Sequence, residues 1–219
     1  MKNGNKSILF IGTSLIAAFL IWTILVSYID VRAIGPQGSR VGFSTLNGYV
    51  HKTLGVNILL YTVTDLMGLV PIGIAAGFAV LGLIQLIERK SLVKVDRSLL
   101  LLGTFYVVVI FFYLLFEFLV INYRPVLIDG YLEASYPSST TLLTCCIMPT
   151  AIMQFNRRIA NVMFKRCIVT LSIAFTAFTV IARLISGVHW LSDIIGGSLL
   201  SAGLVMIYYF LIRHHSPRS

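Results

Sequence analysis

The sequence predicts an all-α integral membrane protein with a bundle of six transmembrane helices. Of its 219 residues, 58% are hydrophobic and only 11% are charged, and the mean hydropathy is +0.92. Such a composition is typical of a polytopic membrane protein and excludes a soluble domain. The apolar residues form runs of about 20, the length that crosses the hydrocarbon core as a helix. The whole chain, residues 1–219, therefore suits a single membrane domain.

The apolar runs and polar breaks place the expected elements in order. The first run follows two lysines, is long and lacks a clear cleavage site, so we expect a retained span rather than a signal peptide. A polar stretch with a Gly-Pro turn at 35–38 follows. The run 57–87 is too long for one upright span, so we expect a break near Asp65, with the part before it at the outer surface. The predicted spans are 8–28, 66–87, 99–121, 137–155, 167–185 and 188–212.

The positions of the basic residues predict the topology. With the N-terminus inside, the inner segments hold twelve Lys and Arg residues and the outer segments five, which together make the 17 of the chain. Cytoplasmic loops are the ones enriched in these residues, so both termini should be cytoplasmic. We expect the protein to lie in the plasma (inner) membrane. The net charge of +9 then reflects topology, and we expect no nucleic-acid partner. Arg124, Arg183 and His189 all fall on the outer, extracytoplasmic side.

The stretch 182–193 concentrates polar residues between two apolar runs. His189 and Asp193 are four residues apart, so on a helix they share one face. A carboxylate there can fix one imidazole nitrogen and leave the other free as a nucleophile. Arg183, six residues before His189, together with a helix N-terminus favours a phosphate dianion. The stretch therefore predicts a phosphoryl site with a histidine nucleophile; the alternative is a set of interfacial polar residues at a membrane turn.

Three pieces of the sequence resemble the motifs of the type 2 phosphatidic acid phosphatase superfamily, which includes membrane lipid phosphatases and soluble acid phosphatases. The family motifs are Lys, six residues, Arg-Pro; then Pro-Ser-Gly-His; then Ser-Arg, five residues, His, three residues, Asp. The matching positions form a core at 117–193: Arg124-Pro125 for the first motif, Pro137-Ser138 for the second, and Arg183, His189 and Asp193 for the third, with Ala182 in place of its Ser.

The resemblance implies roles for these residues. His189 would be the nucleophile that forms a phosphohistidine, and Asp193 would orient it. Arg124, Arg183 and Ser138, with its neighbour Ser139, would hold the phosphoryl oxygens. We expect no cofactor and no metal site, and the three cysteines at 145, 146 and 167 lie in or beside apolar runs, where they suit small buried hydrophobes.

The chain departs from the family pattern at two positions. Glu117 stands where the family has Lys, and an ionised Glu repels phosphate. Thr140 stands where the family has His, and its hydroxyl is too weak an acid to protonate a leaving alkoxide. General acid catalysis contributes about 10²- to 10⁴-fold. Two hypotheses follow: a phosphatase that solves these steps differently, or a catalytically impaired member that binds or helps transport lipid phosphates.

Loss of the general acid matters least when the leaving group is weakly basic. Pyrophosphates expel a phosphate monoester, so we expect prenyl pyrophosphates to be preferred over phosphatidic acid, with undecaprenyl pyrophosphate as the substrate by resemblance to bacterial members of the family. The expected partners are this lipid and the bilayer; the oligomeric state is left open.

Several outer polar residues have more than one interpretation. Glu117 suits an ion pair with Arg124 or Arg183, a structural carboxylate, or a proton donor in place of Thr140. Asp65 suits either an ion pair with an outer arginine or a solvated helix end. His51 and Lys52 are of the two residue types that the motifs lack, and either could reach the site, although loop histidines are usually solvated.

Overall fold

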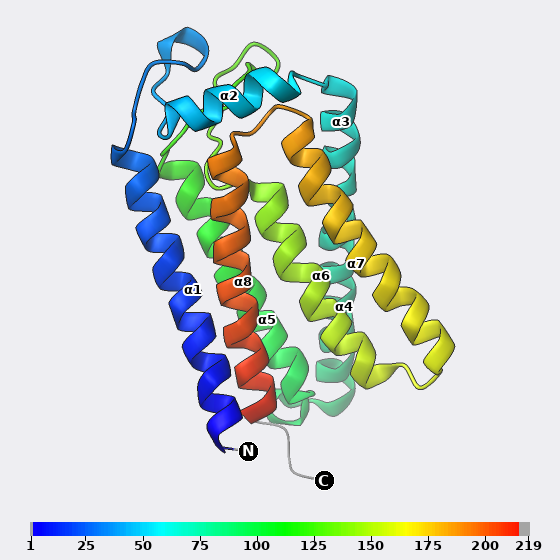
Figure 1. The fold of residues 1–219 in the computed structure, drawn as a ribbon. Coiled ribbons are helices and arrows are strands. Elements are labelled where there is room, and N and C mark those ends of the chain that lie inside the picture. The colour runs from blue at the N-terminus through cyan, green and yellow to red at the C-terminus, as the bar shows by residue number, and fades with distance from the viewer. Residues whose placement is uncertain (1, 215–219) are drawn as a thin grey trace.

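The computed structural model describes residues 2–214 and shows helices joined by short loops (Figure 1). Among the described residues the extended backbone is limited to isolated bridges. Residue 1 and residues 215–219, which include most of the predicted cytoplasmic tail, lie outside the described part. The helices are α1 Lys2–Tyr28, α2 Ser44–Leu54, α3 Ile58–Met67, α4 Leu69–Arg89, α5 Arg97–Phe118, α6 Ser139–Arg158, α7 Val162–Ile185 and α8 Leu191–His214, with 3₁₀ turns at Pro36–Gly38 and Leu92–Lys94.

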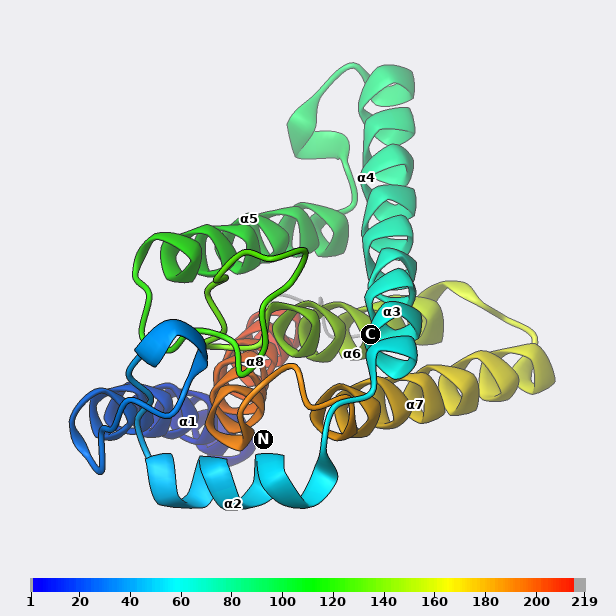
Figure 2. The ribbon, with the colours of Figure 1, turned by 90° about the horizontal axis from the view of Figure 1, so that it is seen from above.

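Five segments of the described chain are long and apolar enough to cross a membrane, which supports the prediction of a multi-pass membrane protein. They are Asn5–Tyr28, Ile58–Arg89, Arg97–Phe118, Val162–Ile185 and Leu191–His214. The sixth predicted span, 137–155, forms α6 but is not among them. α6 is enclosed by α4, α5, α7 and α8 (Figure 2), and it buries hydroxyl-bearing residues such as Thr144 and Thr150. A helix surrounded by protein does not need a lipid-facing surface, so its sequence is less apolar, and its crossing stays a prediction.

The break in the long apolar run lies at Gly68, three residues after the expected position near Asp65. The segment before the break, which we expected at the outer surface, forms α3, which continues in line with α4 (Figure 1) and packs on α7. The helix that lies across the end of the bundle is α2 (Figure 2). This arrangement brings the polar face of α3, with Thr64 and Asp65, beside Arg183 of α7.

α8 forms the centre of the bundle and packs on α1 and α6. Its contacts belong to a core that includes Phe19, Leu142 and Leu200, each at most 1% exposed. Gly197 allows α6 to approach, because a Cβ there would lie 3.1 Å from the Ser138 carbonyl oxygen. The described ends of α1 and α8 lie together, opposite α2 (Figure 1). The bundle thereby presents its loops and α2 at one end, where the polar residues gather.

Candidate active site

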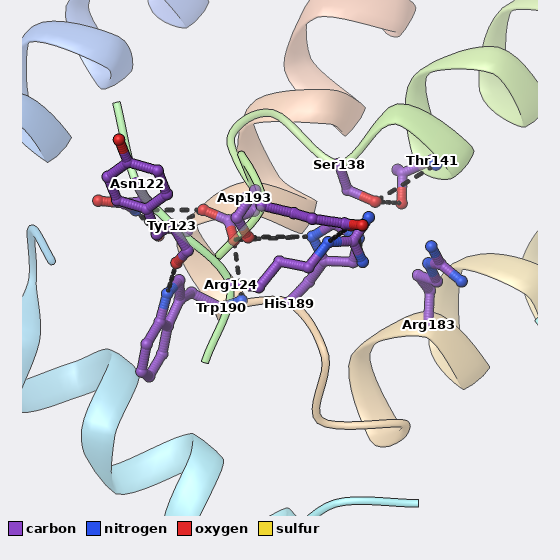
Figure 3. Close-up of polar contacts among 12 residues, drawn as sticks. Asn122, Tyr123, Arg124, Ser138, Thr141, Arg183, His189, Trp190 and Asp193 are labelled. Atoms are coloured by element: carbon purple, nitrogen blue, oxygen red, sulfur yellow. Dashed lines mark hydrogen bonds and ion pairs between the residues drawn. The ribbon is translucent and has the colours of Figure 1, made fainter. Parts of the chain in front are cut away.

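Of the third-motif residues, Arg183 lies in the last turn of α7, His189 in the connection between α7 and α8, and Asp193 in the first turn of α8 (Figure 3). Gly187 makes the turn with a φ of +70°, a conformation that a side chain disfavours. The Asn57 backbone N–H donates to the Ser186 carbonyl oxygen at 2.9 Å, and the Ser138 N–H donates to the Asp193 carbonyl oxygen at 3.1 Å. These backbone bonds tie the turn to the start of α3 and to the start of α6.

His189 and Asp193 are both buried, with 3% and 0% of their surface exposed. Their side chains approach each other as the spacing predicts, but Nδ1 of His189 lies 3.8 Å from Oδ2 of Asp193, beyond hydrogen-bond distance. The hydroxyl of Ser135 lies 3.2 Å from that Nδ1 and donates a short hydrogen bond to the same carboxylate oxygen. The histidine and the aspartate are therefore connected through Ser135.

The carboxylate of Asp193 is held by three further donors. Oδ2 accepts the backbone N–H of Trp190 at 2.9 Å. Oδ1 accepts Nδ2 of Asn122 at 3.2 Å and the hydroxyl of Ser192 at 3.3 Å. Asn122 lies in the loop after α5, and Trp190 and Ser192 lie at the start of α8. Both of these segments therefore fix the position of the carboxylate.

Arg124 lies beside the other side of the imidazole ring. Its Nη1 is 3.4 Å from Nε2 of His189, and its Nε forms an ion pair with Glu133 at 3.0 Å. The Arg124 backbone N–H also donates to the Glu133 carbonyl oxygen at 3.0 Å. The loop that follows α5 therefore delivers a guanidinium to the nitrogen that is free of Ser135.

Arg183 is the second guanidinium of the site and is 1% exposed. It donates to the hydroxyl of Thr64 at 3.2 Å and pairs with Asp65 at 3.4 Å. Its charge lies 4.8 Å from the centre of the Tyr61 ring, a favourable cation–π distance. Its Nε is buried without a partner among the described residues. An unpartnered donor on a buried cation suits an anionic ligand.

Both arginines line a polar cavity of about 630 Å³ at the α2 end of the bundle. Glu117 and Ser139 line the same cavity, and they also line a smaller pocket that contains His189. The structure thus brings together five of the predicted site residues around connected space. Asp193 stands behind His189, away from both cavities.

Besides Asp193, two other predicted site residues do not face this space. The hydroxyl of Ser138 caps α6, where it accepts the backbone N–H of Thr141 at 3.5 Å and the Thr141 hydroxyl at 3.1 Å. Thr140 is 7% exposed, lines neither cavity and lies near Gly68, so its side chain points toward the α3–α4 junction. A side chain at 140 therefore does not reach a group bound beside His189.

The acidic residues are arranged differently from our first expectation. In the described chain Glu117 is exposed and forms no ion pair with Arg124 or Arg183, because these arginines pair with Glu133 and Asp65. Asp65 is thereby an ion-pair partner rather than a solvated helix end. His51 packs on Trp190, 5.3 Å between ring centres, and lines neither cavity.

Sequence reasoning missed four residues of the site. Ser135, Asn122 and Glu133 lie in the long loop between α5 and α6, where nothing in the sequence marks them. Tyr61 was detectable, since it shares a helix face with Thr64 and Asp65 at spacings of three and four. Its role depends on the correct placement of α3 against α7.

The electrostatic environment keeps His189 neutral. Burial lowers its pKa well below 6.5, and the nearby charges of Arg124 and Arg183 lower it further. A neutral imidazole carries a proton on one ring nitrogen and a lone pair on the other. The arrangement therefore combines an uncharged nitrogen nucleophile with two cations at a cavity, which suits attack on a phosphoryl group.

Comparison with known proteins shows the family and a similar fold. The family described as the PAP2 superfamily matches residues 102–216. The structure is similar to the crystal structure of a transmembrane PAP2-type phosphatidylglycerolphosphate phosphatase from Bacillus subtilis. The TM-score is 0.62 and the identity 18%, over 95% of this chain and 98% of that one. No curated protein sequence matches the chain.

Proposed function

Because this chain belongs to the PAP2 superfamily, we propose that it is a membrane lipid phosphatase whose nucleophile is His189. The observation that carries the proposal is the neutral, buried His189 with Nε2 3.4 Å from Arg124, beside a cavity that Arg183 also lines. In this mechanism Nε2 attacks the phosphorus and the bond to the leaving oxygen breaks. Water then attacks the phosphohistidine and releases phosphate.

The arginines would stabilise the charge that develops on the phosphoryl oxygens. Arg124 and Arg183 approach the cavity from different elements, so they can contact different oxygens of one phosphoryl group. Ser139, the first residue of α6, lines the same cavity, which suits an anion near a helix N-terminus. Asp193 would act behind the nucleophile rather than on the substrate.

The finer proposal is that the substrate is a prenyl pyrophosphate, in particular undecaprenyl pyrophosphate. Thr140 does not face the cavity, so a leaving oxygen receives no proton from that position. A pyrophosphate needs this proton least, because its leaving group is a phosphate monoester. The twelve-to-five distribution of Lys and Arg supports a site on the extracytoplasmic face of the plasma membrane, six crossings and cytoplasmic termini.

A second candidate function is binding or transport of a lipid phosphate without turnover. Glu117 favours it, because a carboxylate lines the cavity where the family has a Lys. The ion pairs of Arg124 with Glu133 and of Arg183 with Asp65 also offset the positive charge of the site. A phosphate ligand would then compete with carboxylates for both guanidinium groups.

Phosphate release by the purified protein from a panel of lipids separates these functions. We expect turnover of prenyl pyrophosphate, slower turnover of phosphatidic acid, and none for the His189→Ala variant. Binding of the lipids without release would favour the second function. Faster release from phosphatidic acid than from prenyl pyrophosphate would contradict the substrate argument.

A further inference from the structure

Ser135 occupies the space between the imidazole of His189 and the carboxylate of Asp193. Its hydroxyl oxygen is 3.2 Å from Nδ1 of His189 and makes the short contact with Oδ2 of Asp193, while these two atoms remain 3.8 Å apart. Ser135 is 3% exposed, so bulk water does not fill this place. A hydroxyl both donates and accepts hydrogen bonds, so it can join two groups that do not touch.

The direction of these hydrogen bonds follows from counting donors. Asp193 is an acceptor when ionised, and its oxygens receive bonds from Trp190, Asn122 and Ser192 as well as from Ser135. The Ser135 proton therefore points to the carboxylate. Its oxygen is then left to accept, and the only donor that the neutral ring can offer is a proton on Nδ1.

We propose that Ser135 is a positioning residue that fixes the tautomer of His189 through the chain Nδ1–H, Ser135 hydroxyl, Asp193 carboxylate. The proton stays on Nδ1, and the lone pair stays on Nε2, which faces Arg124. No covalent bond to Ser135 forms and no net proton moves along the chain. When Nε2 becomes phosphorylated, the ring gains positive charge, and the hydroxyl that accepts from Nδ1 stabilises it.

This role differs from that of a hydroxyl that only fills space. A space-filling serine would influence folding and packing, and its loss would act independently of Asp193. A relay acts only together with the carboxylate that orients it, so the two residues should behave as one unit. The effect on rate rests on the proposed phosphatase function, whereas the tautomer does not.

The tautomer can be measured directly by ¹⁵N NMR of the full chain labelled at histidine in detergent micelles. The chain has four histidines, and the His189 signals are those that His189→Gln removes. We expect a protonated Nδ1 and an unprotonated Nε2 in the native protein and in Ser135→Thr. In Ser135→Ala we expect a mixture of tautomers. A native protein protonated on Nε2, or an unchanged tautomer in Ser135→Ala, would overturn the proposal.

Kinetics provide a second measurement if the protein turns over. Ser135→Ala should slow formation of the phosphoenzyme by about 10- to 100-fold, less than the roughly 10⁴-fold cost of a wrong tautomer in a serine protease triad. KM should change little, because the cavity-lining arginines are untouched. In an Asp193→Asn background the same change should cost less than about 2-fold. Equal costs in both backgrounds would contradict the relay.

Two controls keep the outcome decisive. Ser201→Ala removes the hydroxyl of a different buried serine, which lies in α8 and donates to the Ser198 carbonyl oxygen. This variant should leave the tautomer and the rate unchanged. Thermal unfolding of each variant identifies loss of fold. If Ser135→Ala does not fold, the Ser135→Thr variant decides the role of Ser135, because it must retain the native tautomer. Absence of phosphate release from the native protein would refute the proposed function, while the NMR result would still decide the role of Ser135.

Discussion

Gly187 is the position where a single added methyl group should affect the site most. A Cβ at this residue would lie 1.9 Å from the Gly55 carbonyl oxygen, whereas ordinary contacts begin at 3.4 Å. Gly187→Ala therefore forces the turn and the α2–α3 connection apart by about 1.5 Å, the difference between these two distances. Both sides of the contact are backbone, so no side chain can move aside instead.

The displacement should reach His189, which follows two residues later. A misplacement of about 1 Å can lower a catalysed rate about 10²-fold, so we expect kcat to fall about 100-fold in Gly187→Ala. The positive φ adds about 1 kcal/mol of strain, so the free energy of unfolding should also fall. Phosphate release gives the rate, and thermal unfolding in detergent shows how much protein remains folded.

Gly38→Ala is the matched control. Gly38 has a φ of +74° but nothing within 4 Å of its added Cβ, so this variant has the backbone strain without the collision. It should lose some stability and retain its rate per folded molecule. Native kcat in Gly187→Ala, or an equal loss in Gly38→Ala, would refute the argument from the contact with Gly55.

Three further predictions test the charge and topology of the site. A cysteine at Gly38 should react with an impermeant thiol reagent in intact cells; reaction only after lysis would reverse the topology. Because folding lowers the pKa of His189, the unfolded state takes up this proton at a higher pH than the folded state, so stability should fall progressively as the pH drops below about 6.5. His189→Gln should weaken this dependence, and an identical pH profile would contradict it. Glu117→Gln should fold normally, because Glu117 has no ion pair in the described chain, and should bind inorganic phosphate more tightly once the repulsive charge is gone. If turnover also falls, most of all on monoesters, Glu117 supplies the missing proton; unchanged binding and turnover would leave it a structural carboxylate.

The sequence predicted the helices and much of the site because these are local properties. Apolar runs locate most spans, and the spacing of Arg183, His189 and Asp193 places them at the end of one helix, in the turn after it and at the start of the next helix. α6 illustrates the limit of this reasoning: its neighbours are protein rather than lipid, so hydropathy does not reveal how it lies in the bilayer.

Contacts between distant segments were the part that could not be predicted. Ser135 is 54 residues from His189 and 58 from Asp193 in the sequence, so no periodicity joins them. The partner of Arg124 could not be predicted for a similar reason, because Glu133 reaches Arg124 through a loop conformation. Asp65 reaches Arg183 only because α3 stands upright beside α7.

These two ion pairs have a kinetic consequence. Glu133 and Asp65 have 43% and 58% of their side-chain surface exposed, so each can turn toward solvent when another anion takes its guanidinium. Each can also return when that anion departs. In the proposed phosphatase, the carboxylates would compete with free phosphate and reduce its affinity by the fraction of time they occupy the arginines. Departure of inorganic phosphate would then exchange one anion for another, which would limit inhibition by product.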